Sequence, residues 1–355
     1  MRTRLLPALL YTLLPLAGLP LTGMLASTAF ADDKANYATR PEAQTLIREL
    51  ADEGLDVSRV RKVLSEAERQ PAILEAIARP AERVLTWGDY RRIFIRDTRI
   101  EQGLEFWREH RALLERAQEN YGVPAEIIVA IIGVETSYGR NMGNWRVVDA
   151  LATLGFDYPP RADFFRRELG HLFRLEQEAG IDAATVRGSY AGAMGMPQFI
   201  SSSYRAYAVD FDGDGKIDLI NSVPDVVGSV ANYFKAHRWR TGEPVATRAQ
   251  VASDADTRLF GTEYRLRDLT LNKAAEAGIT PQPCSDSNPF CLEDPDGDMR
   301  VAALGLEGHP GDEHWLTGHN FYVITRYNHS HLYAMAVLQL SQLLREGMDE
   351  AQSAN

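Results

Sequence analysis

The chain has 355 residues and a formal net charge of −11; 45% of its residues are hydrophobic and 25% are charged. This length gives room for one large domain or two to three small ones, with an ample core. An acidic chain without a basic cluster is a poor nucleic-acid binder, so we expect no nucleic-acid partner. Beyond the first 31 residues no stretch is long and apolar enough to cross a membrane, so we expect no membrane anchor.

Residues 1–31 have the features of an export signal. Arg2 and Arg4 precede an apolar stretch, and Ala29-Phe30-Ala31 offers a small-x-small cleavage site. We therefore expect cleavage after Ala31 and a soluble periplasmic protein if the cell is Gram-negative; an N-terminal membrane anchor is the alternative. Because neither cysteine of the chain lies in this segment, we do not expect a lipoprotein.

The segment 32–118 follows the periodicity of helices. Apolar residues recur there at three- and four-residue spacing, as at Leu46, Ile47 and Leu50. Gly54 and Asp56 predict a helix stop and the N-cap of the next helix. We predict a helical domain over 32–118, which a C-terminal helix within 319–350 joins.

The segment 119–240 opens with an apolar run that ends in a carboxylate. On a helix over 124–138, Glu135 shares one face with Ile128, Ile131 and Ile132. An ionised carboxylate on such a face must be paired, hydrogen-bonded or protonated, and a carboxyl in an apolar pocket can act as an acid. The alternative is a side chain that turns outward to solvent or to Arg140. The spacing alone does not decide between these readings.

A second part of this segment, RGSYAGAMGMPQF (187–199), is dense in small residues. Small residues let the backbone approach a ligand or another helix closely. Ser189, Gln198 and Tyr204 can supply hydrogen bonds to a ligand with hydroxyl and amide groups. Tight helix packing is the alternative explanation of the glycines.

The loop DFDGDGKIDLINSVPD (210–225) has the spacing of a calcium loop. Its carboxylates stand at alternate positions, contributed by Asp210, Asp212 and Asp214. Hard oxygen ligands at this spacing, with Gly215 at the bend, suit Ca²⁺. The usual position of the bidentate Glu holds Asn221 instead, so the strict motif fails there. We expect a structural Ca²⁺; a loop of Asx-turns that needs no ion is the alternative.

The segment 241–318 is richer in Gly, Pro and Asp, and we predict a small β-rich domain. Short β-like runs occur at 264–271 and 300–306. Cys284 and Cys291 are close together in an exported chain without paired metal ligands beside them, which favours a local disulfide over a metal site. Two free thiols are the alternative. The whole chain is predicted to be mainly α (α+β), with this insertion before a last helix.

Five blocks of the sequence, in this order, resemble the lytic murein transglycosylases of the membrane-bound B type and their soluble relatives: GVETSYGR (133–140), GSYAGAMGMPQF (188–199), SSYRAYAVDFDGDGKIDL (202–219), VGSVANYFKAHRW (227–239) and RYNHSHLYAMAV (326–337). The resemblance implies a lysozyme-like catalytic core over 119–240 that contains the loop 210–225. It also implies that peptidoglycan glycan strands are the main partner and that other cell-wall enzymes are further candidates.

By this resemblance, Glu135 is a lone catalytic acid that later acts as the base. It would cleave the MurNAc-β-1,4-GlcNAc bond without water and leave 1,6-anhydro-MurNAc ends. The sequence is compatible with a single carboxylate, because no acid follows Glu135 until Asp149 and none lies in 183–209. A hydrolytic muramidase and a non-catalytic, calcium-dependent murein-binding protein are the alternatives.

The resemblance also assigns residues around the acid. Ser189 and Gln198 match active-site positions, and Tyr90, Tyr233 and Asn328 match positions of the sugar-binding groove. Sugars present apolar faces and hydroxyl edges, which suit aromatic and amide side chains. Ordinary core packing is the alternative for each tyrosine.

Two further groups complete the expected site. Arg161 is a candidate partner for a muropeptide carboxylate, although Phe164 stands where some members have a tyrosine. In the calcium loop, Asp225 is expected to replace the missing bidentate ligand, and Lys216 to supply its carbonyl. We expect no catalytic cofactor.

Overall fold

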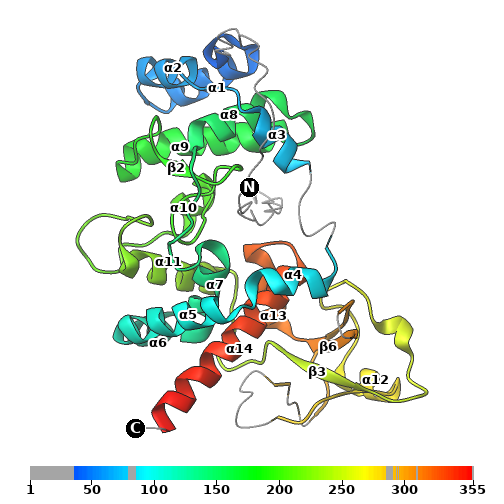
Figure 1. The fold of residues 1–355 in the computed structure, drawn as a ribbon. Coiled ribbons are helices and arrows are strands. Elements are labelled where there is room, and N and C mark those ends of the chain that lie inside the picture. The colour runs from blue at the N-terminus through cyan, green and yellow to red at the C-terminus, as the bar shows by residue number, and fades with distance from the viewer. Residues whose placement is uncertain are drawn as a thin grey trace, which may run out of the picture. The chain divides into compact units, whose positions relative to one another are not determined.

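The computed structural model describes residues 36–78, 85–284, 291–292, 294, 296–308 and 311–353. The expected export signal at 1–31 lies outside the described residues. The described chain forms two compact units (Figure 1). Unit 1 contains residues 85–138 and those from 227 onward, and unit 2 contains residues 36–78 and 139–226. The four-part division expected along the sequence remains a prediction.

The described residues of unit 2 form helices, connecting loops and one short two-stranded ribbon. Its ribbon pairs β1 (Trp145–Arg146) antiparallel with β2 (Arg187–Gly188). Helix α8 packs on α9 and α3, and α10 packs on α9. The helices are α1 (Pro41–Asp52), α2 (Val57–Ser65), α3 (Pro71–Ile77), α8 (Val147–Asp157), α9 (Ala162–Ala179) and α10 (Ser201–Tyr207).

The boundary between α1 and α2 follows the sequence signals. Gly54 adopts a left-handed φ of 86° directly after the C-cap of α1, a conformation that glycine takes without steric cost. The Asp56 side chain accepts hydrogen bonds from the amides of Ser58 and Arg59, which are otherwise unpaired donors at a helix start. The predicted stop and N-cap are both confirmed.

Unit 1 packs its longest helix, α14, against several others, among them α13. Helix α14 contacts α4, α5 and α7, and α7 also contacts α5 and α6 (Figure 1). The C-terminal helix expected within 319–350 is divided into α13 and α14, and α14 continues to Ser353 with Leu344 and Met348 on its buried side. The helices are α4 (Trp87–Phe94), α5 (Asp97–Glu109), α6 (Arg111–Tyr121), α7 (Ala125–Thr136), α13 (His319–Tyr327) and α14 (His331–Ser353); α11 (Val223–Ala236) begins in unit 2 and continues into unit 1.

A four-stranded antiparallel sheet lies within the segment expected to be β-rich. The strand order is β4-β3-β6-β5. A small core of its own includes Leu271, Ile279, Val301 and Leu316. The strands are β3 (Ala246–Val251), β4 (Ile279–Pro281), β5 (Ala302–Leu306) and β6 (Glu313–Thr317), and the short helix α12 (Leu271–Glu276) precedes β4. Cys284 and Cys291 form a disulfide, with Cα atoms 5.3 Å apart.

One of the two expected strands in this segment is wrong. The run 300–306 forms β5, but 264–271 forms no strand and ends at the start of α12. Pairing is limited to one bridge between Thr270 and Arg300, and side chains bind nearby amides: Glu263 accepts from the Arg265 amide, and Thr270 caps α12 through the Lys273 amide. Such bonds compete with strand pairing.

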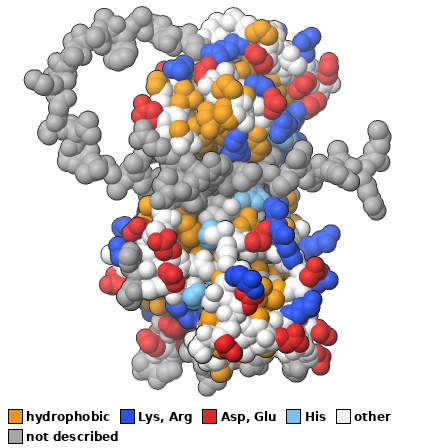
Figure 2. Space-filling view, turned by 90° about the vertical axis from the view of Figure 1, so that its right-hand side faces the viewer, with side chains coloured by type: hydrophobic (Ala, Val, Ile, Leu, Met, Phe, Trp, Pro, Cys, Tyr) orange, Lys and Arg blue, Asp and Glu red, His pale blue; other side chains and the backbone are white. Residues whose placement is uncertain are grey.

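The surface carries charges of both signs. Figure 2 shows Lys and Arg side chains interleaved with Asp and Glu on the described residues of the face in view. Among the described residues, the structure contains no helix of the length and apolar character needed to span a membrane.

Candidate active site and acidic loop

Helix α7 carries Glu135 in its last turn. Ala125–Val134 and Thr136 are all buried, and Glu135 is the one residue of α7 that is partly exposed. The sequence indicated one apolar face, but α7 is buried on more than one side, because α5, α6 and α14 all pack on it. The carboxylate thus lies at the end of a buried, mainly apolar helix.

The Glu135 carboxylate is held by a tyrosine of α14. The Tyr333 hydroxyl donates a hydrogen bond of 2.6 Å to Oε1 of Glu135. Burial, and next the charge of Glu135, raise the pKa of Tyr333 well above its usual value. The hydroxyl therefore keeps its proton and remains a donor to the carboxylate.

Sequence reasoning missed Tyr333. The signal was present, because Tyr333 lies among the apolar residues of the last helix, and a buried tyrosine hydroxyl usually requires a partner. What the sequence lacked was the identity of that partner, which lies 198 positions away.

Further aromatic side chains surround this pair. The ring of Tyr327 is stacked on that of Tyr333 with centroids 6.4 Å apart, and Tyr233 lies 4.8 Å from Tyr327. Burial, followed by the charge of Glu135, raises the pKa of Tyr327 as well. Tyr90 is fully buried and interacts electrostatically with Tyr333. Glu135 therefore lies near two protonated phenols, those of Tyr333 and Tyr327.

Two groove candidates of unit 1 have distinct environments. Tyr233 donates a 2.6 Å hydrogen bond to the Arg326 carbonyl, which fixes its ring. Asn328 is 3% exposed, and its Nδ2 has no hydrogen-bond partner among the described residues. An unpaired buried donor costs about 1–3 kcal/mol, so Asn328 is suited to a ligand or water acceptor.

In unit 2, the small-residue segment forms a tight loop around Ser189. The Ser189 amide donates to the Ala193 carbonyl at 2.8 Å, and Ser189 Oγ accepts from the Ala193 amide at 2.9 Å. A Cβ on Gly188 would lie 2.1 Å from the Ala193 carbonyl oxygen, so the close approach needs glycine. The hydroxyl proton of Ser189 is not used by this contact.

Gln198 lies in the same loop with a left-handed φ of 50°. Its Nε2 donates to the carbonyls of Gly195 at 2.9 Å and Met142 at 3.1 Å. Both amide hydrogens are engaged, so the group that this side chain can offer to a sugar hydroxyl is the acceptor Oε1.

Arg161 lies in unit 2 before α9. Its guanidinium stacks over the ring of Phe164, 4.3 Å from the centroid, and lies 5.1 Å from that of Phe165. The phenylalanine that departs from the expected pattern thus gives Arg161 a cation–π surface in place of a hydroxyl.

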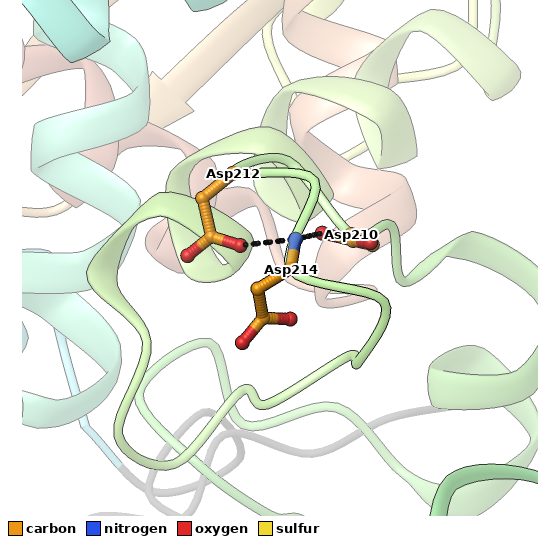
Figure 3. Close-up of side chains that lie close together, drawn as sticks. All are labelled: Asp210, Asp212 and Asp214. Atoms are coloured by element: carbon orange, nitrogen blue, oxygen red, sulfur yellow. Dashed lines mark hydrogen bonds between the residues drawn. The ribbon is translucent and has the colours of Figure 1, made fainter.

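The acidic loop brings three carboxylates together. Ligand atoms of Asp210, Asp212 and Asp214 all lie within 4.8 Å of one another (Figure 3). Asp210 accepts hydrogen bonds from the amides of Gly213, Asp214 and Gly215, and the Gly215 bond contributes most to lowering the pKa of Asp210. The Lys216 amide donates to Asp214 at 2.8 Å.

Asp225 ties the two ends of this loop. It is buried, and it accepts hydrogen bonds of 2.8 Å from the amides of Phe211 and Asp218. Burial raises the pKa of Asp225, and the charges of Asp212 and Asp210 add to this effect. Asp225 is not one of the three grouped carboxylates, so its role as a fourth ligand stays a prediction.

The acidic loop is joined directly to the loop that carries Ser189 and Gln198. The Met196 amide donates to the Leu219 carbonyl at 2.9 Å. Tyr204 donates to the Ile217 carbonyl and accepts from the Leu219 amide. In unit 2 the two predicted elements therefore share a backbone connection.

The predicted residues fall into two sets. Unit 1 holds Glu135, Tyr90, Tyr233 and Asn328, and unit 2 holds Ser189, Gln198, Arg161 and the acidic loop. The hydrogen bonds described above connect residues within each set.

Comparison with known proteins decides the family. The transglycosylase SLT domain matches residues 38–342. The chain belongs to the SLT transglycosylase family. A curated family relative, membrane-bound lytic murein transglycosylase B of Escherichia coli K12, is 42% identical over 318 residues, which are 86% of this chain and 83% of that protein.

Solved structures of SLT transglycosylases agree with this assignment. Lytic transglycosylase SltB1 of Pseudomonas aeruginosa is 46% identical with a TM-score of 0.79, over 88% of this chain and 99% of its own. Escherichia coli Slt35 in complex with calcium is 40% identical with a TM-score of 0.75, over 87% and 94%. SltB3 of Pseudomonas aeruginosa, in complex with NAG-anhNAM-pentapeptide, is 30% identical with a TM-score of 0.71, over 84% and 77%.

This SLT transglycosylase is therefore an enzyme that acts on peptidoglycan, a lytic murein transglycosylase. The mainly α, lysozyme-like fold expected from the sequence is confirmed. A purely non-catalytic binding protein, one of the alternatives from the sequence, has no support from this family.

Proposed function

We propose that the enzyme cleaves the MurNAc-β-1,4-GlcNAc bond without water and leaves 1,6-anhydro-MurNAc ends, with Glu135 as acid and then base. One observation carries the proposal: Glu135 is the partly exposed residue at the end of a buried, mainly apolar helix, and the protonated hydroxyl of Tyr333 holds its Oε1 at 2.6 Å. The hydrogen bond thus gives the carboxyl a fixed orientation at the end of α7.

In the first step, protonated Glu135 gives its proton to the glycosidic oxygen. The bond from C1 to that oxygen breaks, and GlcNAc leaves as an alcohol. Glu135 becomes a carboxylate, and the Tyr333 hydroxyl stabilises this new charge by a hydrogen bond to it. The cationic sugar is stabilised by its own 2-acetamido oxygen, so no second enzyme carboxylate is required.

In the second step, the carboxylate of Glu135 takes the proton of the C6 hydroxyl of the same MurNAc. The oxygen of that hydroxyl attacks C1 and closes the 1,6-anhydro ring. Glu135 returns to its protonated form, and no water is consumed. The complex of SltB3 with NAG-anhNAM-pentapeptide supports such a product for this family member.

Other side chains would hold the glycan. Ser189 can donate its hydroxyl proton, Gln198 can accept at Oε1, and Asn328 can donate from its unpaired Nδ2. Within unit 1, Tyr233, fixed by its bond to the Arg326 carbonyl, and the fully buried Tyr90 would support the groove. Arg161, stacked on Phe164, would pair with a carboxylate of the peptide stem.

We also propose a structural Ca²⁺ in the acidic loop, as the calcium complex of Slt35 suggests. The donor set fits this ion, because three carboxylates within 4.8 Å supply hard oxygen ligands. Asp210, Asp212 and Asp214 would hold it, with the Lys216 carbonyl and Asp225 in support. The ion would stiffen the loop, and we assign it no catalytic step.

The substrate sets the proposed compartment. Murein lies outside the cytoplasm, and residues 1–31 read as an export signal, so we place the mature enzyme in the periplasm.

The proposal is tested with Glu135→Gln and a matched control on the same helix. Glu126 is 3% exposed and lies in the first turn of α7, 3.7 Å from Arg345. We expect Glu135→Gln to lower the release of soluble fragments from murein by at least about 10³-fold, because the acid and the base are both lost. Glu126→Gln should stay within a few fold of wild type. A Glu135→Gln protein that solubilises murein as well as wild type would overturn the assignment.

A further inference from the structure

The chain turns sharply just after Glu135 through two residues of unusual conformation. Ser137 has φ 50° and ψ 50°, and Tyr138 has φ 60°. Residues other than glycine rarely adopt this left-handed region, and each such residue costs on the order of 1 kcal/mol or more. Neighbouring contacts must therefore hold the turn in place.

Tyr138 is the first of these contacts. Its side chain is buried, and its ring lies where α5 and α7 each carry a glycine: a Cβ on Gly103 would be 2.2 Å, and one on Gly133 2.5 Å, from the Tyr138 hydroxyl. The hydroxyl donates to the Arg99 carbonyl at 3.1 Å. Gly103 and Gly133 thus leave a space between α5 and α7, the Tyr138 slot, which this ring fills.

Backbone hydrogen bonds close the turn onto α7. The Ser137 amide donates to the Gly133 carbonyl at 3.0 Å, and the Tyr138 amide donates to the Ile132 carbonyl at 3.3 Å. This is the pattern that ends a helix with left-handed residues, although glycine usually stands there.

Arg99 of α5 is the third contact. Its Nη2 donates to Ser137 Oγ at 3.0 Å, and its guanidinium lies 5.2 Å from the ring of Phe94. The other terminal nitrogen, Nη1, is buried without a hydrogen-bond partner among the described residues. Among those residues Arg99 has no ion pair, and burial lowers its pKa.

Burial of the Arg99 guanidinium is unfavourable, so its position must offer compensating interactions. Its position at the carboxyl end of α7 is favourable, because cations stabilise the negative end of the helix dipole. Its hydrogen bond reaches the residue two positions after Glu135. Arg99 therefore restrains the turn that follows Glu135, while the Tyr333 hydroxyl holds the carboxylate itself.

We propose that Arg99, Ser137 and Tyr138 form a turn clamp whose function is to position Glu135 for proton transfer. This inference rests on the proposed function of Glu135. The three residues are positioning residues, because none of them is assigned a contact with substrate.

The decisive test replaces Ser137 in two ways. Ser137→Gly tolerates the left-handed turn and removes the acceptor of Arg99, whereas Ser137→Asn tolerates the turn and offers a new acceptor. Since misplacement of a catalytic group by ~1 Å costs up to ~10²-fold, we expect Ser137→Gly to lower kcat about 10-fold. Its KM and thermal unfolding midpoint should stay near those of wild type, and Ser137→Asn should recover most of kcat.

Arg99→Met and Arg108→Met form the second pair. Arg108 is an exposed residue of the same helix α5. We expect Arg99→Met to lower kcat by at least as much as Ser137→Gly, and Arg108→Met to leave kcat and KM unchanged. Rates are measured on soluble glycan strands, with products identified by mass spectrometry.

Two results separate the possible failures. If Glu135→Gln is inactive while Ser137→Gly and folded Arg99→Met keep wild-type kcat, the clamp is purely structural and this inference is wrong. If Glu135→Gln keeps its activity, the proposed function itself is wrong. A fall in unfolding midpoint without a fall in kcat for Ser137→Gly also overturns the clamp.

Discussion

The end of α7 and the acidic loop 210–225 both turn the chain through left-handed residues, but they are held in opposite ways. At the end of α7 the left-handed residues are Ser137 and Tyr138, and side chains from α5 and backbone groups of α7 hold them. In the acidic loop they are Gly213 and Gly215, with no atom within 4 Å of a would-be Cβ at either. Its carboxylates bind mainly amides of the same loop.

This difference separates a rigid site from an adaptable one. Buried contacts that converge from several helices leave one arrangement, which suits a group that must transfer a proton over a short distance. An exposed loop with three like charges gains stability when a cation neutralises them. Two kinds of change test this difference. Removal of Ca²⁺ tests the acidic loop, and removal of single side-chain contacts tests the end of α7.

The largest expected effect is on the acidic loop. At a Ca²⁺ concentration of 100 times Kd, an ion that binds only the folded protein adds about 2.7 kcal/mol of stability. We expect the thermal unfolding midpoint to rise with added Ca²⁺ and to fall again with a chelator. Asp214→Asn should weaken this response, and the exposed Asp254→Asn should not. Equal midpoints with Ca²⁺ and with chelator would show that the loop needs no ion.

The next effect is at the carboxylate. Tyr333→Phe keeps the buried ring and removes the donor to Glu135. Hydrogen bonds to charged groups contribute about 1.5–3 kcal/mol, so we expect kcat to fall about 10- to 100-fold. Tyr322→Phe on α13 is the matched control. Unchanged kcat in Tyr333→Phe would mean that the hydrogen bond is not used in the reaction.

Only some features of the fold and of these two regions could be predicted from the sequence. Local patterns located α7, the Asp56 cap and strand β5, because periodicity and capping act over a few residues. They also marked Glu135 and the three loop aspartates as unusual. The Tyr333 and Arg99 contacts could not be predicted, since each joins residues from different helices and depends on how those helices pack. The expected strand at 264–271 did not form because backbone pairing is confined to a single bridge, Thr270 with Arg300, while side chains bind nearby amides.

A smaller effect is expected when the Tyr138 slot is narrowed. Gly103→Ala places a Cβ 2.2 Å from the Tyr138 hydroxyl and 2.5 Å from Leu344, so both must move. Overpacking costs about 1–3 kcal/mol, and the helix preference of alanine returns up to about 1 kcal/mol. We expect a net loss of stability of about 1 kcal/mol in denaturant unfolding, together with a lower kcat. Gly261→Ala, with nothing within 4 Å of its Cβ, should change neither the stability nor kcat. A Gly103→Ala protein with wild-type stability and kcat would show that the Tyr138 slot is not tightly packed.

The smallest effect is expected from acid. His331 begins α14, and burial lowers its pKa from 6.5 to about 4. The folded state thus binds the proton less well than the unfolded state, so its contribution is complete above pH 6.5 and is lost as the pH falls toward 4. Between pH 8 and pH 6 this amounts to about 0.8 kcal/mol. Unfolding of His331→Gln at both pH values should show a smaller loss than wild type; an identical loss would exclude His331 as a source.

The central claim is that one carboxylate performs both proton transfers and that the substrate supplies the nucleophile. The most direct measurement is mass spectrometry of the glycan ends that wild-type enzyme produces from intact murein in heavy-oxygen-labelled water. We predict anhydro ends, lighter than reducing ends by one water and free of the label. Reducing MurNAc ends that carry the label at C1 would show hydrolysis and contradict this account.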